Sequence, residues 1–141
     1  MGERQHLYIP VAARGRKGMK GNVLVIEDNA QNLYLVRFIL EKNGYTVHAA
    51  MDGQAGIDMA AELKPDVILL DIQLPVMDGY AVARNLRANP ELAAIPIVAV
   101  TSHAMVGDRE KAMEAGCNGY IEKPINPDTF MSEVERHLVK A

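Results

Sequence analysis

Apolar and polar residues alternate in blocks along this chain from residue 22 onward. Short apolar runs rich in branched side chains predict buried strands at 23–26, 67–70 and 97–100, with weaker candidates at 45–47 and 120–121. Between them, stretches of helical length predict helices over residues 30–42, 53–63, 79–88, 104–115 and 127–139. Asp52 and Asn126 are expected N-caps, and Gly44 and Gly116 lie where helices are expected to end.

This alternation of strands and helices predicts an α/β fold. A strand followed by a helix five times over implies a five-stranded parallel sheet with helices on both faces, which is a doubly wound, three-layer arrangement. In such sheets, ligands bind outside the carboxyl ends of the strands, at the point where the strand order reverses. The residues that end the predicted strands are therefore the candidates for chemistry.

Charge divides the chain into two parts. Residues 1–21 carry five basic residues and one acidic residue, a net charge of +4, so the remainder carries −7 of the total of −3. We expect residues 1–21 to be a disordered extension and residues 22–141 to be the folded domain. An acidic domain argues against nucleic-acid binding.

Composition sets further bounds on the class of protein. The 141 residues include a single cysteine, Cys117, so a disulfide within the chain is impossible and a reducing compartment is favoured. No apolar run approaches the roughly 18 residues of a membrane span. We therefore expect a cytoplasmic protein that does not bind membranes.

Polar and charged residues stand at the ends of four predicted strands. Glu27 and Asp28 follow the first strand, Asp71 the third and Thr101 the fourth, and Lys123 comes soon after the fifth. Taken singly, each would be an ordinary cap, turn or surface residue. In a parallel sheet these strand ends open on one edge, so we expect three carboxylates, a hydroxyl and an ammonium group to converge there.

Such a group of side chains has a defined chemistry. Two carboxylates about 4 Å apart repel by roughly 4 kcal/mol at an effective dielectric constant near 20, so the cluster takes up protons or binds a hard cation. Oxygen ligands with room for water suit Mg²⁺. With the metal bound, Asp71 can act as an anionic nucleophile, and Lys123 can balance the charge of an incoming phosphoryl group.

Four segments resemble the signature segments of response-regulator receiver domains in bacterial two-component signalling. They are Val25–Asn29, Leu69–Gly79, Val100–Ser102 and Gly119–Pro124. The resemblance extends from about residue 22 to the C-terminus. Within the family, the chain looks most like single-domain cell-cycle receivers and receivers of hybrid histidine kinases. The resemblance implies a flavodoxin-like (βα)5 fold with strand order 2-1-3-4-5.

The resemblance also implies a metal site and a phosphoacceptor. Asp71 would take a phosphoryl group from a phosphohistidine on a sensor histidine kinase or a histidine phosphotransfer protein. Asp28, Asp71 and the backbone carbonyl of Gln73 would ligate Mg²⁺ directly, and Glu27 would act mainly through a bound water. In this family the side chain at the position of Gln73 tunes hydrolysis of the acyl phosphate.

The same resemblance implies a switch. Thr101 would move to hydrogen-bond the phosphoryl oxygens, with which Lys123 would pair, and Tyr120 would change rotamer as Thr101 moves. This change would alter the face built from the fourth predicted helix, the fifth strand and the fifth helix, where a downstream protein would bind. The Lys123–Pro124 bond is typically cis in the family, and Ser102 replaces the usual alanine after Thr101.

We therefore expect a phosphoacceptor switch without an output domain of its own, in which Asp71 is a substrate residue and the protein is not an enzyme. A receiver excised from a hybrid histidine kinase would share this chemistry and differ only in context. An aspartate-nucleophile phosphatase typically shows an Asp-x-Asp pair after its first strand, where this chain has Glu27 and Asp28. In a flavodoxin-like cofactor binder, these two carboxylates would repel the phosphate.

Overall fold

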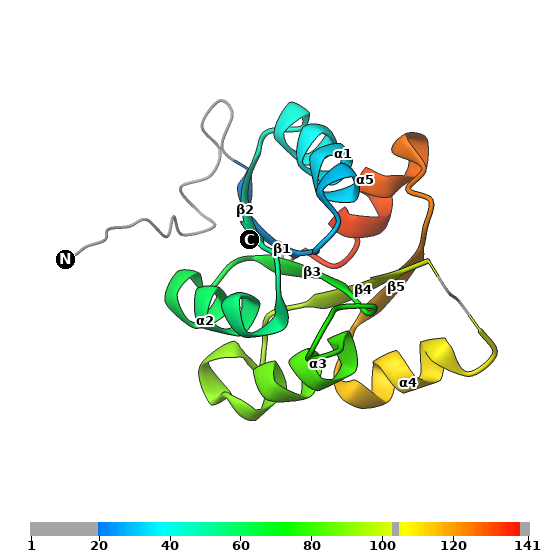
Figure 1. Cartoon of the computed structure of the whole chain (residues 1–141). Helices are drawn as coiled ribbons and strands as arrows, with labels where there is room; N and C mark the ends of the chain where they lie inside the picture. The colour runs from blue at the N-terminus through cyan, green and yellow to red at the C-terminus, as the bar shows by residue number, and fades with distance from the viewer. Residues whose placement is uncertain (1–19, 103–104, 139–141) are drawn as a thin grey trace.

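The computed structural model describes residues 20–102 and 105–138, which form a parallel sheet between two layers of helices (Figure 1). The strands are β1 (Gly21–Ile26), β2 (Tyr45–Ala50), β3 (Val67–Asp71), β4 (Ile97–Thr101) and β5 (Gly119–Glu122). The helices are α1 (Ala30–Lys42), α2 (Gly53–Leu63), α3 (Gly79–Ala88), α4 (Asp108–Ala115) and α5 (Pro127–Glu135), with a short 3₁₀ helix, η2 (Pro90–Leu92). The order β2-β1-β3-β4-β5 confirms the predicted fold class and strand order.

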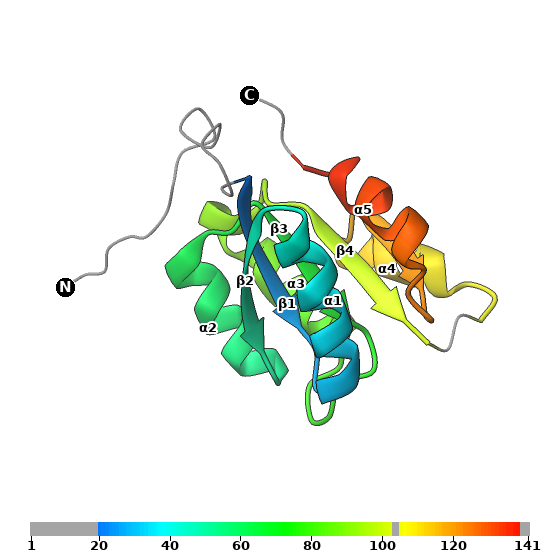
Figure 2. The same cartoon turned by 90° about the horizontal axis from the view of Figure 1, so that it is seen from above.

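The helices divide between the two faces of the sheet, with α1 and α5 on one face and α2, α3 and α4 on the other (Figures 1 and 2). Alternate residues of β1 enter different cores: Leu24 and Ile26 pack on the α2–α3–α4 side, and Val23 and Val25 on the α1–α5 side. Because both faces of the sheet are buried, the central strands appear in the sequence as continuous apolar runs.

Side-chain caps lie at the start of four of the described α-helices. The side chains of Asn29, Asp52, Asp78 and Asn126 accept hydrogen bonds from backbone N–H groups in the first turns of α1, α2, α3 and α5. These caps satisfy donors that have no partner within a helix. The predicted caps Asp52 and Asn126 are thereby confirmed, as is Gly116, which ends α4 with a φ of 113°.

The prediction for the fourth helix was wrong at its start. It placed the helix over 104–115, whereas α4 begins at Asp108 and residues 103–104 lie outside the described residues. Gly107 has a φ of 91°, and the Asp108 carboxylate accepts a hydrogen bond from the Met105 N–H. The left-handed conformation of Gly107 and this local side-chain hydrogen bond form a turn, and the helix begins only after it.

The predicted N-terminal extension meets the sheet at its last residues. Gly21, assigned to the extension, is the first residue of β1, and the Lys20 N–H donates to the Gly44 carbonyl. The rest of the predicted extension, residues 1–19, lies outside the described residues. Among the helices that the structure describes, none has the length and apolar character needed to cross a membrane.

Candidate functional site

Three carboxylates meet at the carboxyl edge of the sheet, where the strand order reverses around β1. Glu27 and Asp28 directly follow β1, and Asp71 is the last residue of β3. One carboxylate oxygen from each lies within 4.8 Å of the others. Glu27 and Asp71 are buried and Asp28 is exposed. The parallel sheet thus brings together side chains that are 43 positions apart in the sequence.

Lys123 supplies a positive charge to this cluster from the loop after β5. Its Nζ donates to Glu27 Oε1 at 2.8 Å and lies 3.6 Å from Asp71 Oδ2. The Lys123–Pro124 peptide bond is cis, as the resemblance implies. The other carboxylate oxygen of Glu27 accepts from the Asn29 N–H at 3.1 Å. Both carboxylate oxygens of Glu27 are therefore hydrogen-bonded, which fixes this side chain next to Asp71.

The Asp71 carboxylate is electrostatically strained without a cation. Burial, together with the nearby negative charge of Glu27, raises its pKa to about 7 against the opposing effect of Lys123. Among the described residues, the Lys123 ammonium group contacts two of the three carboxylates, and the exposed Asp28 leaves the cluster open to water. Oxygen ligands with access to water are the donor set that Mg²⁺ prefers, so the residues present fit this ion.

Backbone geometry fixes the position of Asp71. Its Oδ1 accepts from the Gln73 N–H at 3.0 Å, and the Gly79 N–H donates to the Ile72 carbonyl at 2.9 Å. A Cβ at Gly79 would lie 2.6 Å from both the Asp71 carbonyl oxygen and the Ile72 Cα. The start of α3 can therefore pack this closely on the end of β3 only because residue 79 has no side chain.

Thr101 ends β4 next to this cluster, and the Gln73 side chain contacts it. Gln73 Nε2 donates to Thr101 Oγ1 at 2.8 Å, while Gln73 Oε1 accepts from the backbone N–H and the hydroxyl of Ser102, both at 3.3 Å. The resemblance assigned the backbone carbonyl of Gln73 to the metal and its side chain to tuning of acyl-phosphate hydrolysis, but it did not predict a contact between that side chain and Thr101. The side-chain contact joins residues 28 positions apart, and no sequence pattern indicates it.

Tyr120 lies on β5 rather than in the acidic cluster. The strand register pairs it with Ala99, whereas Glu122 pairs with Thr101. Its hydroxyl is buried and has no hydrogen-bond partner among the described residues. The Arg109 guanidinium lies 5.2 Å from the centre of its ring, a cation–π contact that sequence reasoning missed.

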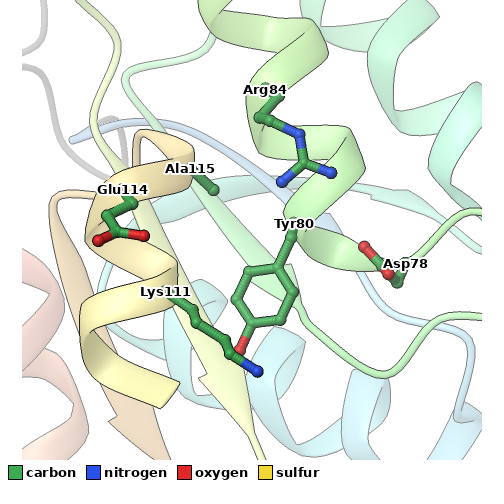
Figure 3. A pocket seen from close by; sticks show the side chains of 6 residues that line it. All are labelled: Asp78, Tyr80, Arg84, Lys111, Glu114 and Ala115. Carbon is green, nitrogen blue, oxygen red and sulfur yellow. The ribbon is translucent and has the colours of Figure 1, made fainter. Parts of the chain in front are cut away.

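A separate cavity of about 370 Å³ lies between α3 and α4 (Figure 3). Tyr80 and Arg84 of α3 line it, together with the cap residue Asp78 and with Lys111 and Glu114 of α4. It contains none of the three clustered carboxylates. The charged residues of this cavity therefore form a surface distinct from the Asp71 site.

Comparison with known proteins gives consistent matches. Residues 23–135 match the response regulator receiver domain family. The chain is 40% identical over 120 residues to the polar-differentiation response regulator DivK of Brucella anthropi, covering 85% of this chain and 98% of DivK.

Solved structures show the same fold. Vibrio cholerae chemotaxis protein CheY4 aligns with a TM-score of 0.79 at 28% identity, over 83% of this chain and 98% of that one. The receiver domain of Pseudomonas aeruginosa sensor histidine kinase PA1611, whose structure has a magnesium ion coordinated in the active site cleft, aligns with a TM-score of 0.77 at 35% identity, over 83% and 96%. The fold, the acidic cluster and these matches together establish that the chain belongs to the response regulator receiver domain family of two-component systems.

Proposed function

We propose that this protein is a phosphoacceptor switch in which Asp71 receives a phosphoryl group from a phosphohistidine on a sensor histidine kinase or a histidine phosphotransfer protein. The observation that carries the proposal is the placement of Asp71. It is a buried carboxylate at the end of β3, within 4.8 Å of two other carboxylates and 3.6 Å from an ammonium group. The magnesium-bound receiver of PA1611 supports the same assignment.

The metal site would consist of Asp28, Asp71 and the backbone carbonyl of Gln73, with Glu27 acting through a bound water. Bound Mg²⁺ would supply positive charge beside the transferring phosphoryl group. The chain's own contribution is to hold the carboxylates in place. Lys123 fixes Glu27, and the Gln73 N–H fixes one oxygen of Asp71.

In the transfer, an oxygen of Asp71 forms a bond to phosphorus as the bond from phosphorus to the donor's imidazole nitrogen breaks. The electron pair of that bond returns to the ring, which carries a proton on its other nitrogen and leaves as neutral imidazole. Lys123 and the Thr101 hydroxyl then stabilise the phosphoryl oxygens. Asp71 is consumed in each transfer, so the protein is a switch rather than a turnover enzyme.

The output would be a change of the surface built from α4, β5 and α5. A cavity of about 190 Å³ on this surface is lined by residues that include Arg109, Tyr120 and Glu133. A phosphoryl group adds about −1.5 to −2 charges, and its contacts with Thr101 would shift Tyr120 and so bias this surface between two states. The partner would be a downstream protein, rather than a nucleic acid or a membrane, and the setting the cytoplasm.

The test is phosphorylation by a small donor. The protein is incubated with acetyl phosphate and Mg²⁺, and its intact mass is measured. We expect one phosphoryl adduct that requires Mg²⁺, disappears in Asp71→Asn and persists in Asp78→Asn, a control that removes another carboxylate from the same loop while keeping a good N-cap residue. An adduct that survives in Asp71→Asn would overturn the assignment.

A receiver that belongs to a hybrid histidine kinase remains the second candidate, supported by the likeness to the PA1611 receiver. The two candidates differ in the identity of the phosphodonor. Phosphotransfer from a panel of autophosphorylated kinases would separate them. A receiver of a hybrid kinase is expected to prefer the histidine of its own kinase.

A further inference from the structure

The residue two positions after Asp71 contacts both the phosphoacceptor and the neighbouring strand. Its backbone N–H donates to Asp71 Oδ1 at 3.0 Å, and its side-chain Nε2 donates to Thr101 Oγ1 at 2.8 Å. Gln73 therefore bridges the carboxylate that would be phosphorylated and the hydroxyl that would contact the phosphoryl group. Neither bond depends on the other, because one uses the backbone and the other the side chain.

Ser102 determines which way the Gln73 carboxamide faces. A backbone N–H can only donate, so the atom of Gln73 that lies 3.3 Å from the Ser102 nitrogen has to be the oxygen. The amide nitrogen then faces Thr101 Oγ1, which has to accept. Thr101 consequently cannot give its hydroxyl hydrogen to Gln73, and the hydrogen is directed toward a different acceptor.

Resting on the function proposed above, we propose that the Gln73 side chain is a positioning group that orients the Thr101 hydroxyl as a hydrogen-bond donor to a phosphoryl group on Asp71. The phosphoryl oxygens only accept hydrogen bonds, so they need Thr101 as a donor. Gln73 occupies the acceptor side of that hydroxyl. The role is separate from any effect of Gln73 on hydrolysis of the acyl phosphate.

The surroundings favour a positioning role over a packing role. Gln73 is exposed, so replacing its carboxamide leaves no cavity in the core, whereas Thr101 is only 2% exposed. Methionine has nearly the same length and shape as glutamine and makes no strong hydrogen bond. In Gln73→Met the backbone hydrogen bond to Asp71 remains, and the side-chain hydrogen bond that orients the Thr101 hydroxyl is lost.

The experiment is a double-mutant cycle read by ¹⁹F NMR of bound beryllofluoride, a phosphoryl mimic, in saturating Mg²⁺. We expect Gln73→Met to weaken beryllofluoride binding about fivefold, the effect of about one net hydrogen bond on an equilibrium constant. In a Thr101→Val background, the same substitution should have no effect, because no hydroxyl remains to be oriented. An equal loss in both backgrounds, or no loss in either, would overturn the proposal.

Two further variants test the direction of the hydrogen bond. Gln73→Glu keeps an acceptor for Ser102 but has no donor for Thr101. The Thr101 hydroxyl would therefore donate its hydrogen to the Glu carboxylate and no longer to the mimic. We expect a larger loss than in Gln73→Met, and the part that depends on Thr101 should disappear in Thr101→Val. Ser102→Ala is the matched control: its N–H still orients Gln73, so binding should change less than twofold, the range of a weak, exposed contact.

These outcomes are distinct from failure of the proposed function. If wild-type protein shows no bound beryllofluoride signal and no phosphoryl adduct, Asp71 is not the phosphoacceptor. If wild-type protein binds the mimic and the cycle shows no coupling between Gln73 and Thr101, Asp71 keeps its role and the positioning role of Gln73 is wrong.

Discussion

Replacing Asp71 by Asn should stabilise the metal-free protein at neutral pH, although it removes the proposed phosphoacceptor. The pKa of Asp71 is about 7 in the fold against an ordinary value of 3.8, chiefly because the carboxylate is buried. Between these pH values the folded protein binds more protons than the unfolded chain, so its stability falls as pH rises and stays low above pH 7. The difference between these two pKa values corresponds to up to about 4 kcal/mol of destabilisation of the fold by the ionised carboxylate.

Asn is a suitable replacement because it keeps an oxygen that can accept from the Gln73 N–H, and because Lys123 keeps its partner Glu27. The assay is urea denaturation followed by circular dichroism in EDTA. The free energy of unfolding of Asp71→Asn, relative to that of wild type, should increase by about 2.5 kcal/mol between pH 5 and pH 8.

Saturating Mg²⁺ should reduce this advantage, because it binds the folded wild-type site and stabilises it by mass action. Asp78→Asn, which removes an exposed carboxylate from the same loop, is the control for a general loss of negative charge. If Asp71→Asn is less stable than wild type at pH 8 in EDTA, the carboxylate cluster is not strained and the argument for a cation there fails.

Three other substitutions test how the fold supports the site, each by the free energy of unfolding in urea. Val76 is fully exposed with a φ of 67°, which is unfavourable for a β-branched residue. Val76→Asn should therefore raise the free energy of unfolding by about 1 kcal/mol, and a decrease would contradict this. Arg87 donates to the carbonyls of Leu92, Ile95 and Gly116, so Arg87→Met should lower the free energy of unfolding by about 3 kcal/mol. An unchanged value would show that water replaces the guanidinium group as the donor. Gly79→Ala should cost about 3 kcal/mol because its Cβ meets backbone atoms; unchanged stability would mean that α3 shifts freely.

The sequence by itself determined the order of elements and the residues that end the strands. A parallel sheet covered on both faces needs continuous apolar runs, and Val23–Ile26 and Val67–Leu70 carry that signal strongly. Caps are equally local, so Asp52 and Asn126 could be predicted from the few residues that follow them. Because parallel strands end at a common edge, the meeting of Glu27, Asp28 and Asp71 also followed from their places in the sequence.

Only the tertiary structure decided the contacts between side chains that are distant in the sequence. The hydrogen bond from Gln73 to Thr101 depends on how the loop after β3 packs against β4, and the position of Arg109 over Tyr120 depends on how α4 packs against β5; no periodicity encodes them. The start of α4 depends on a left-handed Gly107 that local helix signals do not reveal. The raised pKa of Asp71 likewise arises from burial and from the charge of Glu27, two quantities that exist only once the sheet has assembled.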